Sequence, residues 1–218
     1  MERIAEPELM DDAAQARAYA GADFCEAHQA FVGYFQARFP HFAAGRVIDL
    51  GCGPADVALR FARAYPGVEV VGVDGAAPML EWGRRAIAAA GLAGRVRLEK
   101  IRLPSAALTA AFDAVISNSL LHHLADPAVL WRTIRQASRP GAPVLVMDLM
   151  RPADAAGAKA LTARYAGGAP GVLQRDFFHS LRAAYRPDEV RAQLDAAGLS
   201  DFSAAAVSDR HWLAWGVR

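Results

Sequence analysis

Two adjacent histidines and a distant aspartate are the residues of this chain best suited to proton transfer. His122 and His123 lie in the stretch SNSLLHHLADP, and Asp148 lies near the end of the apolar run APVLVMDL. Histidine exchanges protons near neutral pH, and a carboxylate can orient it or bind a substrate. At helical spacing, the leucines of the stretch fall on one side and both imidazoles on the other. The pattern predicts a proton-accepting site. The alternatives are structural roles, with the histidines bound to backbone carbonyls and Asp148 capping a helix or paired with Arg151.

A glycine-rich turn in RVIDLGCGPADVALRFA (46–62) joins an apolar strand to a helix, an arrangement typical of nucleotide sites. A phosphate loop needs Lys-Ser/Thr after its last glycine, but Gly53 is followed by PADVA. A dinucleotide site needs a third glycine where Asp56 stands, and Pro54 removes an N–H that would bind phosphate. The turn therefore favours a ligand without phosphate groups.

Two aspartates flank this turn at positions that suit such a ligand. Asp49 comes directly before the turn, at the carboxyl end of a buried strand, where open α/β sheets bind ligands. Asp74 ends the next apolar run and lies at the spacing from which a carboxylate reaches ribose hydroxyls. The structural alternative for Asp74 is a cap of the helix that follows. The pair predicts a ligand with a ribose and a polar end group.

The elements that must position these residues alternate along the chain. The predicted strands span 46–50, 68–74, 95–101, 111–118 and 142–149, with helical patterns over 55–66, 77–91 and 126–141. Further helices are predicted over 8–39, 153–166, 172–183 and 186–198, and two strands joined near Asp209 end the chain. Apolar strands that alternate with helices favour a parallel sheet covered on both faces. The last two strands predict an antiparallel hairpin at its edge.

Four stretches in order resemble the motifs of class I S-adenosylmethionine-dependent methyltransferases of the small-molecule type. These are VIDLGCGPAD, VVGVDGAAPML, FDAVISNSLLHHLADP and RPGAPVLVMDL, which together cover about residues 45–150. The resemblance implies a Rossmann-like three-layer α/β sandwich with a seven-stranded, mostly parallel sheet of order 3-2-1-4-5-7-6 and an antiparallel last strand. It also implies a methyltransferase domain over 45–218, with a helical insertion at about 151–186 and a helical N-terminal cap over 1–44.

The resemblance further implies which residues bind S-adenosylmethionine. Gly51, Cys52 and Gly53 would surround its methionine part, with Asp49 near the amino group. Asp74 and Gly75 would meet the ribose, Met79 the adenine, and Ser117 and Asn118 the sulfonium end. Many family members carry an aspartate after the third strand, but this chain has LEKIRLP there, with no carboxylate after Glu99. Backbone groups of Ile101, Arg102 or Leu103 are therefore expected to bind the adenine.

Aromatic residues are concentrated in the two segments outside the sheet pattern, and they predict an apolar acceptor pocket under a lid. The alternative is that they belong to the core, because aromatic residues at helical spacing usually do. The residues predicted to line the pocket are Tyr19, Phe31, Tyr34, Phe178, His179 and Tyr185.

The composition is that of an ordinary globular chain, and it limits the kinds of binding partner that we expect. The 218 residues are 54% hydrophobic, and 24 basic against 23 acidic residues leave a net charge of +1 without a basic block. These features predict a small-molecule acceptor, no nucleic-acid, membrane or metal partner, and a cytoplasmic location, with a homodimer left open. Two other functions stay open: a non-catalytic sensor of S-adenosylmethionine or S-adenosylhomocysteine, and an NAD-linked oxidoreductase.

Overall fold

The computed structural model describes residues 1–6 and 9–218, and a seven-stranded sheet forms its centre. The strands are β1 (Ala44–Leu50), β2 (Gly67–Asp74), β3 (Val96–Lys100), β4 (Ala114–Asn118), β5 (Pro143–Leu149), β6 (Ser203–Ala206) and β7 (His211–Val217). Their order is β3-β2-β1-β4-β5-β7-β6. The first five are parallel, and β7 runs antiparallel to both β5 and β6. The predicted order and the antiparallel end of the sheet are both confirmed.

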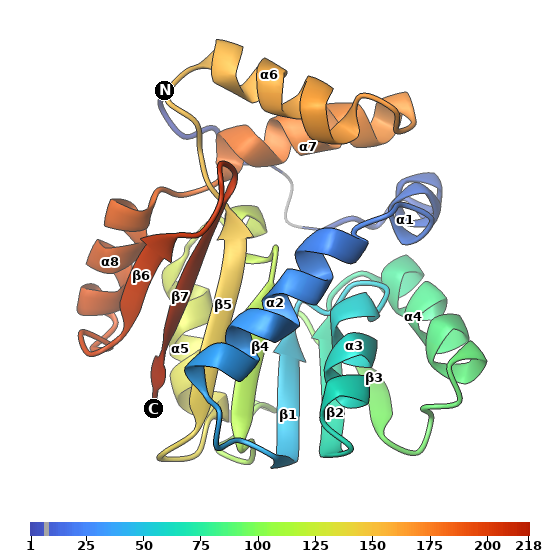
Figure 1. Cartoon of the computed structure of the whole chain (residues 1–218), viewed down its shortest axis with the longest axis vertical. Coiled ribbons are helices and arrows are strands. Elements are labelled where there is room, and N and C mark those ends of the chain that lie inside the picture. Colours follow the sequence, from blue (N-terminus) through green and yellow to red (C-terminus); the bar gives the residue numbers. More distant parts are fainter. Residues whose placement is uncertain (7–8) are drawn as a thin grey trace.

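The helices are α1 (Ala13–Ala20), α2 (Cys25–Arg38), α3 (Asp56–Ala64), α4 (Ala77–Ala89), α5 (Ala128–Ala137), α6 (Ala155–Ala166), α7 (Gly171–Ala183) and α8 (Pro187–Ala196). A short 3₁₀ turn, η1 (Leu121–His123), follows β4. In Figure 1, α2 and α3 lie in front of the sheet, and α5 and α8 lie behind it. Helices α6 and α7 lie above the end of the sheet to which β5 points (Figure 1). This is a three-layer α/β sandwich with additional helices at the carboxyl ends of the parallel strands.

Alternate residues of each central strand enter two separate cores, as expected of a sheet buried on both faces. On β1, Ile48 and Leu50 pack with α5 and α8, while Val47 packs with α2 and α3. Phe35 of α2 is fully buried and contacts the rings of Phe61 and Tyr65. Helix α2 is therefore part of the sandwich itself and not only of an N-terminal cap.

Two of the differences from the predicted boundaries have a clear physical cause. The helix predicted over 8–39 is two helices, since α1 ends at Gly21 and the Asp23 carboxylate accepts a hydrogen bond from the backbone N–H of Cys25 before α2 begins. Its predicted start at residue 8 lies outside the described residues. The strand predicted from 111 begins only at Ala114, because the backbone N–H groups of Ala111 and Phe112 both donate to the carbonyl of Ala137.

Candidate active site

A cavity of about 1620 Å³ opens at the carboxyl ends of β1, β2, β4 and β5. Its walls come from the turns after these strands, from α1 and the start of α2, and from α6 and α7. A cavity of this size can hold a cofactor and a second small molecule together, since sites for one drug-sized ligand occupy about 300–1,000 Å³. Crevices at this edge are where open α/β sheets bind their ligands.

The glycine turn forms one end of the cavity. Gly51 and Gly53 have φ angles of +72° and +50°, which residues with a Cβ rarely adopt. The backbone N–H groups of Gly51 and Cys52 both donate to the carbonyl of Val73, which fixes the turn against β2. A side chain at position 51 would also collide with Leu120, since an added Cβ would lie 2.8 Å from it. The backbone conformation of the turn is thus fixed, and it leaves this end of the cavity unobstructed.

Asp49 lies beneath this turn as a buried carboxyl group with an unsatisfied oxygen. The residue is 1% exposed, and its Oδ2 atom has no hydrogen-bond partner among the described residues. Burial, reinforced by the negative charge of Asp74, raises the pKa of Asp49 to about 8. The amide oxygen of Asn118, on the neighbouring strand β4, is also buried without a partner in the described chain. Both residues line the cavity, so each oxygen is a potential acceptor for a cationic hydrogen-bond donor such as an ammonium group.

Asp74 faces the cavity from the end of β2, with both carboxylate oxygens engaged by the backbone. Its Oδ2 accepts from the N–H of Gly53 at 2.9 Å, and its Oδ1 accepts from the N–H of Ala76 at 2.8 Å. Asp74 therefore braces the turn before α4 but does not cap the helix, whose N-cap residue is Ala76. Each carboxylate oxygen accepts more than one hydrogen bond, so ribose hydroxyls can be bound as well. Gly75 and Met79 line the same part of the cavity.

The predicted adenine and sulfonium residues are not all in the positions expected. Ile101, Arg102 and Leu103 do line the cavity, but the N–H of Ile101 donates to the carbonyl of Asp74 and is not available to an adenine. Ser117 is fully buried and its hydroxyl donates to the carbonyl of Leu50, within the sheet. Ser117 is not among the residues that line the cavity, and Asn118 is.

Asp56 gives the start of α3 a fixed negative charge. Its carboxylate accepts hydrogen bonds from Nδ1 of His28 at 2.7 Å and from Nε of Arg60 at 2.9 Å. Partial burial raises the pKa of Asp56, but these two hydrogen bonds outweigh it and lower the pKa to about 2. Asp56 lines the cavity, and because its carboxylate is held by His28 and Arg60, this helix start offers a phosphate no unpaired positive charge from these residues.

His122 and Asp148 form a buried pair, and His122 lines the cavity. The Nδ1 atom of His122 lies 2.5 Å from Oδ1 of Asp148, and the backbone N–H of His122 donates to Oδ2. Burial lowers the pKa of His122, but the Asp148 carboxylate outweighs it and holds that pKa above its usual value. Burial raises the pKa of Asp148, and the imidazole more than compensates, so this pKa is lowered. Asp148 therefore orients His122 and does not pair with Arg151, which contacts Glu189 instead.

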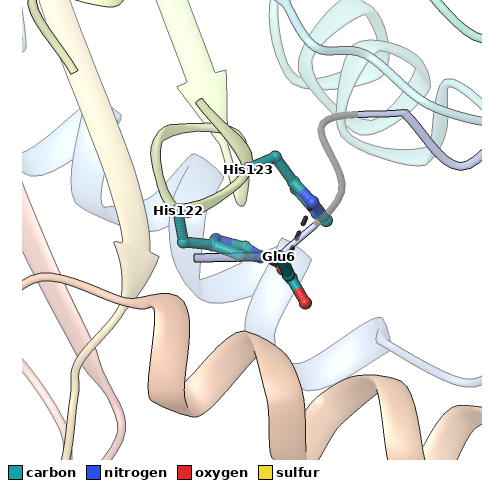
Figure 2. Close-up of side chains that lie close together, drawn as sticks. All are labelled: Glu6, His122 and His123. Atoms are coloured by element: carbon teal, nitrogen blue, oxygen red, sulfur yellow. Dashed lines mark ion pairs between the residues drawn. The ribbon is translucent and has the colours of Figure 1, made fainter. Parts of the chain in front are cut away.

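His123 and the unpredicted Glu6 line the cavity beside His122. The 3₁₀ turn η1 directs both imidazoles toward the cavity with ring centroids 4.2 Å apart, while Leu121 and Leu124 enter the core. The Oε1 atom of Glu6 lies 3.4 Å from Nε2 of His122 and 3.2 Å from Nδ1 of His123 (Figure 2). No periodic or motif signal marks Glu6, because it lies in an irregular, polar N-terminal segment.

The predicted acceptor pocket needs correction at four of its six residues. Tyr19 and His179 line the cavity, but the other four predicted residues do not. Phe31 and Tyr34 pack between α2 and the sheet, and Tyr185 packs in the core behind the sheet with the Arg3 guanidinium over its ring. Phe177 and Phe178 both pack against the small core between α6 and α7, but only Phe177 also lines the cavity. The aromatic residues that line the cavity are Tyr19, Phe24, Trp82, Tyr165 and Phe177.

Comparison with known proteins identifies the family of this fold and site. Residues 47–141 match the model of a methyltransferase domain. The chain is 30% identical over 168 residues to a demethylmenaquinone methyltransferase of Thermus thermophilus, covering 72% of this chain and 76% of that protein. It is 33% identical over 115 residues to a trans-aconitate 2-methyltransferase of an Azoarcus species, covering 53% of this chain but only 43% of that protein.

Solved structures show the same fold. A Methanococcus maripaludis protein described as a putative S-adenosyl-L-methionine-dependent methyltransferase superposes with a TM-score of 0.74 at 17% identity, covering 97% of this chain and 95% of that one. The chain belongs to the class I S-adenosylmethionine-dependent methyltransferases. It is an enzyme that uses S-adenosylmethionine as its cofactor, which replaces both the sensor and the oxidoreductase alternatives. Among the described residues, no helix has the length and apolar character needed to cross a membrane.

The cavity residues fit this cofactor. The unsatisfied oxygens of Asp49 and Asn118 suit its ammonium group, and Asp74 suits its ribose hydroxyls. The negative charge of Asp56 is compatible with a cofactor that carries no phosphate. The sequence points to this same set of residues, although it predicts Asn118 at the sulfonium end and only the structure reveals the unsatisfied oxygen of its amide.

The high pKa of Asp49 leads to a pH-dependent affinity. Between pH 6 and 7.5 the carboxyl group is largely protonated in the free protein, and an ammonium group favours its ionised form. Binding of S-adenosylhomocysteine should therefore release a proton, and affinity should rise with pH by up to about tenfold per unit. Calorimetric titration at several pH values measures this slope. Asp49→Asn should flatten it, and a flat or falling affinity in the unchanged protein would contradict this role of Asp49.

Proposed function

We propose that this enzyme methylates an oxygen, nitrogen or sulfur atom of a small metabolite with an apolar or aromatic body. The observation that carries the proposal is the buried pair of His122 and Asp148, with the imidazole facing the cavity beside Asn118. Such a pair serves a reaction in which the acceptor must lose a proton. The names of the two relatives above specify different acceptors. We therefore infer the acceptor class from the residues that line this chain's own cavity.

The cofactor supplies, when bound, an activated methyl group that passes to the acceptor as its carbon–sulfur bond breaks, leaving S-adenosylhomocysteine. Asp49, Asn118 and Asp74 would hold the cofactor by its two polar ends and fix its orientation. His122 would take the acceptor's proton on Nε2, because its Nδ1 is held by Asp148. Most of the acceleration would come from alignment of the two reactants and exclusion of water, since the methyl group is already activated.

The walls outside the sandwich would bind the acceptor. We propose that the N-terminal residues before α2, together with α6 and α7, form a cap over the site. Phe24, Phe177 and Tyr19 give this cap an aromatic inner surface. His123 lies on the same side and would contact the acceptor beside His122.

A panel of phenols, thiols, amines and carboxylic acids, assayed by formation of S-adenosylhomocysteine, tests the acceptor class. We expect turnover with aromatic phenols, thiols or amines, and little with small hydrophilic carboxylic acids. Turnover confined to the hydrophilic acids would overturn the apolar acceptor and leave the methyltransferase assignment intact.

Substitution of Phe177 tests the cap, and substitution of its neighbour Phe178 is the control. Phe177→Ala should raise the KM of the acceptor identified in the panel by about tenfold, since a partly buried ring is worth about 1.5 kcal/mol. Phe178→Leu, which alters a ring that does not line the cavity, should leave this KM unchanged. Initial-rate kinetics measure both values. Equal effects of the two substitutions would show that α7 does not line the acceptor site.

A further inference from the structure

The cluster of Glu6, His122 and His123 has the composition and spacing of a metal site. One carboxylate oxygen and two imidazole nitrogens face one another at the same end of the cavity, and the three ligand atoms all lie within 4.8 Å of one another. They come from the N-terminal segment and from η1, so segments far apart in the sequence meet here (Figure 2).

The distances within the cluster suit a shared cation. Ligand atoms about 2.0–2.1 Å from a tetrahedral zinc ion lie about 3.3–3.4 Å from each other. The Oε1 atom of Glu6 lies 3.4 Å from Nε2 of His122 and 3.2 Å from Nδ1 of His123. The 3.4 Å separation exceeds the range of a direct N–H···O hydrogen bond, about 2.7–3.2 Å, and the 3.2 Å separation lies at its upper limit. Two of the three distances between the ligand atoms thus match the spacing of ligands around a metal ion.

Outer partners orient two of the three ligands. Asp148 binds Nδ1 of His122, which leaves Nε2 directed toward Glu6, and carboxylate–histidine–metal arrangements use this same partner. Ser180 of α7 donates its hydroxyl to Glu6 at 3.0 Å and fixes that carboxylate. Arg3 donates to the carbonyls of His122 and Leu124 and so ties the N-terminal segment to η1. Hydrogen bonds therefore hold both the η1 residues and the N-terminal segment of the cluster in place.

We propose that Glu6, His122 and His123 bind a divalent transition-metal ion at the acceptor end of the cavity. Two imidazoles and one carboxylate suit zinc, cobalt or iron, whereas magnesium and calcium prefer oxygen ligands alone. Three protein ligands facing a cavity leave a coordination position for another molecule.

The effect of such an ion on catalysis rests on the proposed function, whereas the binding of the ion does not. In the chain without the ion, His122 would accept the proton as proposed above, whereas an ion held on Nε2 would prevent this transfer. It would instead lower the pKa of an acceptor group bound to it, and the acceptor's proton would pass to solvent. Acceptors with a second oxygen or nitrogen next to the methylated atom would then be favoured, because they can chelate the ion.

Titration with Co²⁺ tests the site directly. The untagged full chain is treated with a chelator, desalted and titrated with Co²⁺ while its visible d–d absorption is recorded. We expect saturation at about one ion per chain with a micromolar or lower Kd, displacement by Zn²⁺ and no displacement by Mg²⁺. Absence of a saturable absorption band, in protein that still binds S-adenosylhomocysteine, would overturn the proposal.

Substitutions locate the ion. Glu6→Gln and His123→Ala should each weaken Co²⁺ binding at least tenfold, and Asp148→Asn, which removes the orienting partner of His122, should weaken it by about 10–100-fold. His179→Ala, in an exposed histidine that lines the same cavity, should leave Co²⁺ affinity unchanged. Unchanged S-adenosylhomocysteine affinity in the Glu6 and His123 variants establishes that they are folded. Undiminished Co²⁺ binding in both would place the ion elsewhere and overturn the site.

The same experiments separate this proposal from the proposed function. Saturable Co²⁺ binding that is lost in the Glu6 and His123 variants supports the metal site, whichever acceptors are turned over. Turnover of the predicted acceptors by chelator-treated enzyme supports proton transfer to His122, whereas a lack of saturable Co²⁺ binding in that enzyme overturns the metal site.

Discussion

Replacement of His122 by alanine is expected to lower the turnover number by about 10²–10⁴-fold, the range over which a positioned acid–base group contributes to catalysis. The imidazole is 3% exposed and paired with Asp148, so no other group in the described structure occupies its place. The affinity for S-adenosylhomocysteine should change little, because Asp49, Asp74 and Asn118, which are assigned to the cofactor, lie at the carboxyl ends of β1, β2 and β4. Single-turnover rates and calorimetric titration measure the two quantities separately.

His179→Ala is the matched control for this substitution, since it removes an exposed imidazole that lines the same cavity. It should cost far less than His122→Ala in turnover. Asp148→Asn should lower turnover as well, because an amide in place of the carboxylate no longer stabilises the protonated imidazole. Full activity of the His122 variant would show that the acceptor needs no proton acceptor at this position.

Asp74→Ala is expected to weaken S-adenosylhomocysteine binding by about 10–150-fold. The estimate follows from about 1.5–3 kcal/mol for hydrogen bonds to a charged acceptor. The Asp74 carboxylate also braces the turn through the N–H groups of Gly53 and Ala76. Loss of this brace alone could reduce affinity, so the ribose contact needs a test of its own.

A cofactor analogue without one ribose hydroxyl provides that test. In the unchanged protein, 2′-deoxy or 3′-deoxy S-adenosylhomocysteine should bind at least several-fold more weakly than the parent compound. In Asp74→Ala the difference should be much smaller, because the two changes remove the same interaction. Equal sensitivity to the missing hydroxyl in both proteins would assign Asp74 to the brace alone.

The sheet could be predicted because each strand carries its own pattern. Apolar strands, the glycine turn and the four ordered motifs are local signals, and the order of the sheet follows from the family they resemble. The positions of Asp49 and Asp74 were predictable for the same reason, since each is the last polar residue of an apolar strand before a turn. Their contacts also depend on neighbouring strands, as the unsatisfied oxygen of Asn118 illustrates.

The acceptor side of the cavity could not be predicted in the same way. Phe177 and Phe178 are adjacent aromatic residues on one helix, and only the packing of α7 against α6 decides which of them lines the cavity. Glu6 reaches His122 across more than a hundred residues, and no periodicity or motif connects the two. Long-range contacts between irregular segments and turns produce no regular spacing of residues, so they cannot be recognised in the sequence.

Transfer of an isotope-labelled methyl group from S-adenosylmethionine to small acceptors tests the central claim most directly. We expect a labelled low-mass product with aromatic phenols, thiols or amines, formed by the unchanged enzyme and strongly reduced in His122→Ala. Labelled product formed equally by the two proteins, or no labelled product from any acceptor class while S-adenosylhomocysteine binds normally, would contradict it.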